Sequence, residues 1–269
     1  MTYSIAAVDP SSGEVGGAGT SCLDGGDVHV IYRGVPGRGV VHAQAYYTDA
    51  GRDRAAQLLA QGSSAAEVLA AVTDASFDGG TSRRQYGIVD VLGQAVGFTG
   101  DGTTAFAADV QGTSEGHAYT VQGNILTSAR VLEQAAAAFE AGGCDLAERL
   151  MRALKAGAEH GEGDSRCTPA GIPSDSAFLQ VEQPGGSEGG YLALRVETSG
   201  TADPLPLLQA KFDAWRLEHP CPVVAAPERP AASDPGCACQ HAGPPAGSAT
   251  MWVLVGGLLV AGWRRWMAR

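Results

Sequence analysis

The chain has 269 residues, 44% of them hydrophobic, and a formal net charge of -11. This length allows one large domain or two small ones with a substantial buried core. The acidic balance argues against a nucleic-acid partner, because phosphate binding needs clustered basic residues and Lys155 and Lys211 are the only lysines.

The first part of the chain predicts two pairs of strands. Residues 3–9 alternate weakly and lead into the turn sequence DPSSG, after which residues 14–20 return as a second strand. Residues 28–32 and 39–45 form a further predicted pair, and Pro36-Gly37 turns between them.

The hydrophobic period then changes to that of helices. Residues 52–61 predict one helix, and Ser64 to Glu67 form a capping box that opens a second helix through residue 72. Residues 85–91 and 94–99 return to the strand pattern, with a turn between them.

The same alternation continues to residue 218. Residues 131–141 and 146–154 predict a second helix pair, residues 177–182 and 191–196 predict closing strands, and an amphipathic helix follows Asp203-Pro204. Two antiparallel sheets covered by helices on both outer sides would bury all of these apolar faces. We therefore predict an α+β fold, a four-layer αββα sandwich over residues 2–218.

The C-terminal part of the chain has a different character. Residues 219–245 are rich in Pro, Ala and Gly, which indicates an extended linker. Within residues 246–269, the apolar run is about the minimum length that spans a bilayer, and three arginines follow it. Because positive charge stays on the cytoplasmic side, we expect the domain outside the membrane; a buried helix of the domain is the alternative.

Just before the apolar run stands GCACQ, which contains Cys237. Gly-Cys, a short spacer, an apolar run and an Arg-rich end resemble the myxobacterial C-terminal sorting signal, MYXO-CTERM. The resemblance implies cleavage near Cys237 by a sorting protease, a lipid on Cys237, and display at the cell surface. A plain transmembrane anchor is the alternative. For an exported chain we expect the start to be misassigned or trimmed, and a cut before Thr2 would make Thr2 the first residue; translocation by the tail is the alternative.

Four stretches of the body carry a second resemblance: TYSIAAVDPSSGEVGGAGTSC from Thr2, RQYGIVDVLGQAVGFTG from Arg84, YTVQGNILTSARVLEQAAAAFE from Tyr119 and GDSRCTPAGIPSDSAFLQV from Gly163. Together they resemble the DUF1028 family, which is grouped with the N-terminal-nucleophile (Ntn) hydrolases. The likeness covers about residues 2–218 and implies the same αββα fold. It implies no particular substrate.

The Ntn resemblance makes Thr2 the candidate nucleophile. A threonine hydroxyl needs a base within hydrogen-bond reach, and a free α-amino group titrates at about 7.7–8.0, so it is available as a neutral base. Such a residue must be the first of the mature chain. The alternative is that Thr2 is a β-branched strand residue without a catalytic role.

An amide hydrolase also needs donors aimed at the developing oxyanion. We expect them from Asn124, Gln122 and Gly123, placed by the sequence at the start of a helix, where backbone N–H groups are unpaired. A loop with a helix-capping Asn124 is the alternative.

Five further residues are candidates for substrate binding. Thr20 and Ser21 end the second predicted strand, where they would flank Thr2 or be simple strand residues. His42 and Gln44 share one face of a strand, where His42 would move a proton, hold substrate, or be a core histidine. Arg84 would bind a carboxylate or remain a solvated residue at a strand end.

The six cysteines form no CxxC pair and complete no zinc pattern. In an exported chain we expect a disulfide between Cys144 and Cys167, with Cys22–Cys221 as the alternative. The acidic residues Glu162, Asp164 and Asp175 fit no calcium-loop spacing, so we expect neither a metal nor another cofactor.

Two functions follow from these observations. The first is an extracytoplasmic amide hydrolase acting on a small peptide, amino-acid amide or acyl-amine through Thr2. The second is a surface binding module that has the fold but not the chemistry. The expected partners are an amide substrate, the membrane and a sorting protease; homo-oligomerisation stays open.

Overall fold

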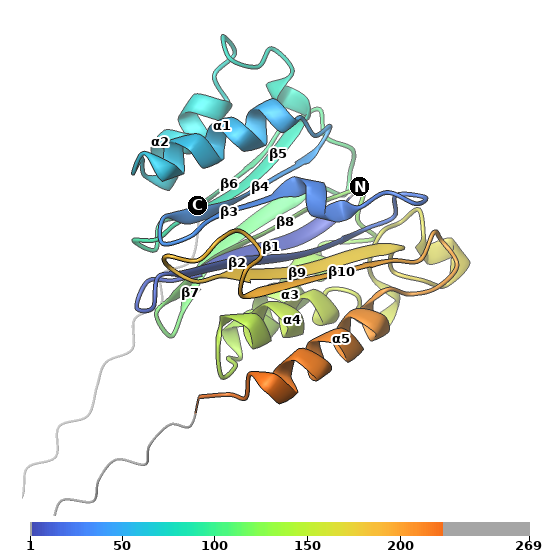
Figure 1. The fold of residues 1–269 in the computed structure, drawn as a ribbon. Helices are drawn as coiled ribbons and strands as arrows, with labels where there is room; N and C mark the ends of the chain where they lie inside the picture. The colour runs from blue at the N-terminus through green and yellow to red at the C-terminus, as the bar shows by residue number, and fades with distance from the viewer. Residues whose placement is uncertain (1, 223–269) are drawn as a thin grey trace, which may run out of the picture. The chain divides into compact units, whose positions relative to one another are not determined.

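The computed structural model describes residues 2–222, which form two antiparallel sheets that lie face to face (Figure 1). The six-stranded sheet has the order β10-β9-β2-β1-β8-β7, and the four-stranded sheet has the order β3-β4-β5-β6. The strands are β1 (Thr2–Asp9), β2 (Glu14–Ser21), β3 (Tyr32–Val35), β4 (Gly39–Ala45), β5 (Arg84–Asp90), β6 (Ala95–Thr99), β7 (Ala108–Ser114), β8 (His117–Asn124), β9 (Ser176–Glu182) and β10 (Leu192–Glu197).

Helices cover the outer face of each sheet. The pair α1 (Asp49–Ala60) and α2 (Ala65–Val72) lies on the four-stranded sheet, whereas α3 (Arg130–Glu140), α4 (Leu146–Ala156) and α5 (Leu205–Glu218) lie on the six-stranded sheet (Figure 1). The predicted α+β sandwich, with its order of helix, sheet, sheet and helix, is therefore confirmed.

Strand β1 lies at the centre of the larger sheet and is buried on both faces, which explains its weak alternation. Ile5 and Ala7 belong to the hydrophobic cluster under α3 and α4. Ala6 and Val8 belong to the cluster between the sheets. Because side chains alternate along a strand, Thr2 points to the same side as Ala6, toward the four-stranded sheet.

Two segments differ from their predicted structure. Residues 28–31 form a short 3₁₀ helix, capped by Asp27, whose side chain accepts a hydrogen bond from the His29 N–H; the strand begins only at Tyr32. Strands β7 and β8 were not predicted. The reason lies in β7, whose side chains are half-buried or exposed and include Asp109 and Gln111, so it lacks an apolar alternation.

The disulfide prediction was wrong in its pairing. The bonds join Cys22 to Cys167 and Cys144 to Cys221, with Cα–Cα distances of 5.9 and 5.6 Å. Neither Cys144–Cys167 nor the alternative Cys22–Cys221 forms. The first bond joins the end of β2 to the loop before β9, and the second joins the residue before the N-cap of α4 to the chain after α5. Pairing thus follows the packing of elements that are distant in sequence.

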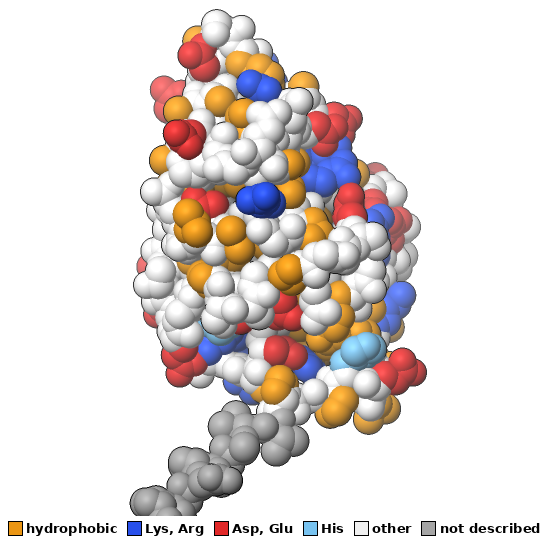
Figure 2. Space-filling model, turned by 60° about the vertical axis from the view of Figure 1, so that its left-hand side comes forward, with side chains coloured by type: hydrophobic (Ala, Val, Ile, Leu, Met, Phe, Trp, Pro, Cys, Tyr) orange, Lys and Arg blue, Asp and Glu red, His pale blue; other side chains and the backbone are white. Residues whose placement is uncertain are grey.

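The predicted sorting segment 246–269, with Cys237 and most of the predicted linker, lies outside the described residues. Among residues 2–222, none of the helices combines the length and apolarity that a bilayer crossing requires. On the face of the domain in Figure 2, Lys and Arg side chains lie among acidic and apolar ones.

Candidate active site at the N-terminal edge of β1

Thr2 begins β1 and lies between the ends of the two neighbouring strands. Its Cα partner on β8 is Asn124. On the other side lies Ser21, the last residue of β2, and the Thr2 hydroxyl donates a hydrogen bond to Ser21 Oγ at 3.3 Å. The Thr2 residue is 6% exposed. The structure therefore brings three predicted site residues together in one row across the sheet edge.

A buried network of amide side chains lies directly behind this row. Gln44 on β4 accepts a hydrogen bond from Ser4 Oγ at 2.7 Å and donates to Gln85 Oε1 at 2.8 Å. Gln44 Nε2 also lies 3.3 Å from the Thr2 carbonyl oxygen. Asn124 Nδ2 donates to the same Gln85 oxygen at 3.0 Å. The network joins the two sheets and fixes the Asn124 side chain beside Thr2.

Gln44 supports this network from the centre, so its removal should be costly. We expect Gln44→Ala to lower the free energy of unfolding by about 2–4 kcal/mol, because Ser4 and Gln85 lose a buried partner and a cavity is left. Urea denaturation measures the change. Gln61→Ala, at an exposed glutamine, is the matched control and should stay within about 0.5 kcal/mol of the parent. A loss below about 1 kcal/mol for Gln44→Ala would show that the network adds little stability.

The expected place of Gln122, Gly123 and Asn124 at a helix start was wrong. They are the last three residues of β8, where their Cα partners on β1 are Ser4, Tyr3 and Thr2. Their main chain takes part in the sheet ladder, and helix α3 begins only at Arg130. Of these three residues, only Asn124 remains a candidate hydrogen-bond donor, through its side chain, toward a group held at Thr2.

His42 lies deeper between the sheets and is fully buried. Its Nδ1 lies 3.3 Å from Gln122 Nε2, and its ring packs against Tyr32 and Phe178. His42 Nε2 has no hydrogen-bond partner among the described residues. Burial, with a smaller contribution from His29, lowers the pKa of His42 to about 3. These surroundings are those of a neutral core histidine.

Thr20 and Arg84 hold neighbouring loops. Thr20 is the cross-strand partner of Tyr3, so its side chain is on the opposite face from Thr2; its hydroxyl donates to the Ser176 carbonyl at 2.8 Å. The Arg84 guanidinium forms an ion pair with Asp78 at 2.7 Å, which raises the Arg84 pKa. Neither arrangement depends on a substrate.

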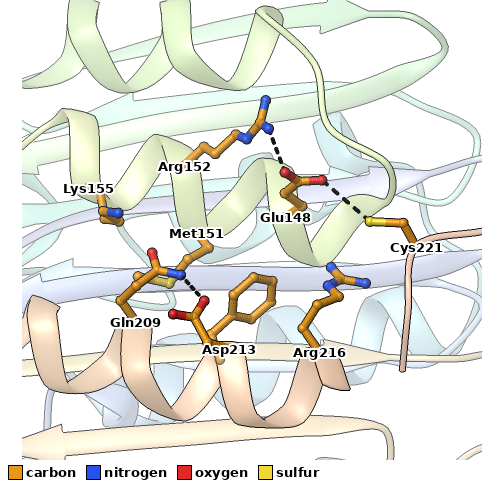
Figure 3. Close-up of a pocket in the computed structure, with 9 residues that line it drawn as sticks. Glu148, Met151, Arg152, Lys155, Gln209, Asp213, Arg216 and Cys221 are labelled. Atoms are coloured by element: carbon orange, nitrogen blue, oxygen red, sulfur yellow. Dashed lines mark hydrogen bonds and ion pairs between the residues drawn. The ribbon is translucent and has the colours of Figure 1, made fainter. Parts of the chain in front are cut away.

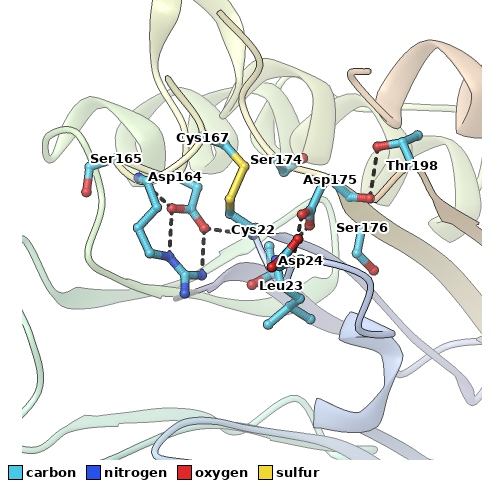
Figure 4. Close-up of a disulfide and its surroundings, with 12 residues drawn as sticks. Cys22, Leu23, Asp24, Asp164, Ser165, Cys167, Ser174, Asp175, Ser176 and Thr198 are labelled. Atoms are coloured by element: carbon cyan, nitrogen blue, oxygen red, sulfur yellow. Dashed lines mark hydrogen bonds and ion pairs between the residues drawn. A yellow bond between two sulfur atoms is a disulfide. The ribbon is translucent and has the colours of Figure 1, made fainter. Parts of the chain in front are cut away.

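Two buried carboxylates, those of Asp164 and Asp175, lie beside the residues that follow β2 (Figure 4). Asp164 Oδ2 accepts a hydrogen bond from the Cys22 N–H at 2.7 Å, and Asp175 accepts from the N–H groups of Leu23 and Asp24 at 2.7 and 2.8 Å. Backbone donors thus satisfy oxygens that a cation would otherwise use. The sequence did not indicate this role of Asp164 and Asp175. It also did not indicate Gln85 and Ser4, for which the available signal was a polar residue inside an apolar strand.

A cavity of about 500 Å³ lies elsewhere, between α4 and α5 on the outer helical layer (Figure 3). Its basic side chains include Arg152, which pairs with Glu148 at 2.5 Å, and Arg216, which pairs with Asp145 at 2.6 Å. The charges of both arginines are therefore already compensated. Because the outer helical layer lies outside the two sheets, the cavity is separate from the row at Thr2.

Comparison with known proteins agrees with this architecture. A crystal structure of a DUF1028 protein from Silicibacter pomeroyi is similar to this chain, with a TM-score of 0.64 and 25% identity, over 80% of this chain and 89% of that one. No curated protein matches. The model of the DUF1028 family, described as a family of unknown function, matches residues 2–208. The chain therefore belongs to the DUF1028 family.

Proposed function

We propose that this domain is an Ntn-type amide hydrolase in which Thr2, once it is the first residue, is both nucleophile and base. The observation that carries the proposal is the position of Thr2 at the start of the central strand β1. There its hydroxyl donates a hydrogen bond to Ser21, and the amide network fixes the side chain of its cross-strand neighbour Asn124. A residue at that place can carry a free α-amino group without a break in the sheet.

The reaction uses few groups. The neutral α-amine accepts the proton of the Thr2 hydroxyl, and Oγ1 attacks the carbonyl carbon of the amide. The Asn124 amide donates to the oxyanion, an interaction that typically contributes about 10²–10³ in rate. The protonated α-amine then gives its proton to the leaving amine, and water releases the acyl group from Thr2. In the resting state the Thr2 hydroxyl donates its single proton to Ser21 Oγ, so the hydroxyl turns to the α-amine before the attack.

We also propose that the domain acts outside the cytoplasm, tethered through its C-terminal segment and exposed to a sorting protease near Cys237. Support comes from the two disulfides within residues 2–222, because such bonds persist in oxidising compartments. A small peptide, an amino-acid amide or an acyl-amine at the cell surface is then the substrate class.

One observation favours a second candidate, a binding module without chemistry. Thr2 is only 6% exposed, and a nucleophile must be reached by a carbonyl group. In a binding module, Thr2 would serve only as a strand residue.

Both ends of the mature chain test the proposal. Mass spectrometry of the protein recovered from the cell envelope should find a free amine on Thr2 and a C-terminus near Cys237. The same material should hydrolyse a member of a panel of peptides, amino-acid amides and acyl-amines. A chain that keeps residues before Thr2, or that cleaves none of the panel, supports the binding module instead.

A further inference from the structure

Residues 162–175, here called the strap, cross the edge of the sheet at the end of β1. On the β8 side, Leu126 and Asp164 form a β-bridge, and the Thr127 N–H donates to the Gly163 carbonyl at 3.1 Å. On the β2 side, the Asp175 N–H donates to the Ser21 carbonyl at 3.0 Å. Since β2 and β8 flank β1, the strap passes over the end of the strand that begins with Thr2.

Asp164 connects the two sides. Its main chain bridges to Leu126 beyond β8, while its side chain binds the Cys22 N–H beyond β2. Asp164 is 1% exposed, and hydrogen bonds to a buried carboxylate are among the stronger ones. The ends of both neighbours of Thr2 are therefore held by one residue of the strap.

The Cys22–Cys167 disulfide fastens the same segment (Figure 4). Cys22 directly follows Ser21, the residue that accepts the Thr2 hydroxyl hydrogen bond. Cys167 is in the middle of the strap and is buried, whereas Ser165, Arg166 and Pro169 beside it are exposed. The covalent bond thus ties an otherwise exposed stretch to the residue next to the candidate site.

Little apolar packing holds the strap. Within residues 2–222, none of the three hydrophobic clusters includes a residue of 162–175. Segments with few buried apolar contacts open locally at low free energy. Polar contacts and the disulfide keep it in place: besides Asp164 and Asp175, Glu162 accepts from the Thr127 and Ser128 hydroxyls, and Ser165 Oγ donates to the Ile125 carbonyl.

We propose that the Cys22–Cys167 bond is a redox-sensitive clasp that keeps the strap closed over Thr2, and that its reduction opens the N-terminal edge of β1. A dithiol supplies two electrons and two protons; the S–S bond breaks, two thiols form, and the dithiol becomes a cyclic disulfide. As a control of access to the nucleophile, the clasp rests on the proposed function. The opening of the strap does not rest on it. The closed strap accounts for the low exposure of Thr2.

The second disulfide provides a matched control. Cys144–Cys221 joins the start of α4 to the chain after α5, on the outer layer. The experiment uses the full chain with Cys237 and Cys239 replaced by serine, and compares Cys144→Ser/Cys221→Ser with Cys22→Ser/Cys167→Ser. Amide hydrogen exchange is followed in residues 20–27, 124–129 and 162–175, with β5 as the internal reference, before and after dithiothreitol.

In the Cys144→Ser/Cys221→Ser chain, dithiothreitol should accelerate exchange in the three segments by about tenfold or more while β5 is unchanged, and reoxidation should reverse the effect. In the Cys22→Ser/Cys167→Ser chain, the segments should exchange fast with or without the dithiol. Unchanged exchange on reduction of the first chain would overturn the clasp, as would equal acceleration in β5, which reports global loosening. The first chain is folded before reduction, so it gives the answer even where the second fails to fold. Hydrogen exchange needs no hydrolysis, so this result stands apart from the fate of the proposed activity.

Discussion

Replacing Thr2 with alanine is expected to reduce amide hydrolysis by the mature chain by about 10³-fold or more, because the variant keeps the α-amine but has no hydroxyl to attack the carbonyl. The fold should persist. Alanine removes a hydroxyl and a methyl group at the sheet edge, and the Thr2 main chain keeps its pairing with Asn124. The measurement is the initial rate on the substrate identified in the amide panel, together with the thermal midpoint of each variant.

Two controls make this result specific. Thr2→Ser keeps a hydroxyl at the same carbon and should retain measurable activity. Thr20→Ala removes a nearby hydroxyl whose side chain lies on the opposite face of the sheet, so it should affect stability more than the chemical step. Full activity of Thr2→Ala with an unchanged midpoint would remove Thr2 from the mechanism.

Much of the fold follows from local chemistry. The Ser64–Glu67 capping box was predicted, and both of its hydrogen bonds are present. The alternation of strand and helix pairs was enough to predict the layers. Residues 28–31 escaped this logic because Asp27 caps a 3₁₀ turn there, a local preference that competes with a short apolar run. Strand β7 was not predicted because its residues form main-chain hydrogen bonds with β8 but contribute few apolar side chains to a core.

The site was harder to predict because its contacts join residues far apart in sequence. Gln44 and Gln122 were singled out on strands or near them, yet nothing local indicates that Gln85 completes their network. The same holds for Asp164: its spacing to Glu162 and Asp175 fits no calcium loop, and nothing local indicates that its Oδ2 accepts a hydrogen bond from the Cys22 N–H. Cysteine pairing failed for this reason too, since sequence order does not determine which loops meet at a sheet edge.

The second large predicted effect is a loss of stability in acid that is due to His42. Its pKa in the folded protein is about 3, whereas an unfolded histidine titrates at about 6.5. The unfolded state therefore binds a proton that the native state excludes. The free energy of unfolding is therefore unaffected by His42 above pH about 6.5. It decreases as the pH falls toward 3, by about 1.4 kcal/mol per pH unit for this one group. At pH 4.5 the loss is roughly 2–3 kcal/mol.

The His42 ring packs closely against β2. An added Cβ at Gly17 would lie 2.2 Å from His42 Nε2, so the ring fits only against a glycine in β2. Glu182 acts in the opposite direction, because burial raises its pKa and the native state then binds a proton more readily. Comparing variants at each pH cancels Glu182 and leaves the His42 contribution.

We therefore expect His42→Gln to flatten the pH dependence of the free energy of unfolding between pH 7 and pH 4.5, gaining roughly 2–3 kcal/mol relative to the parent over that range. Urea denaturation at each pH measures the difference. His160→Gln, at an exposed histidine, should run parallel to the parent. If the His42→Gln and parent curves were also parallel, the native ring would be taking up the proton, and His42 would then have to reach water through an opening of the sheets.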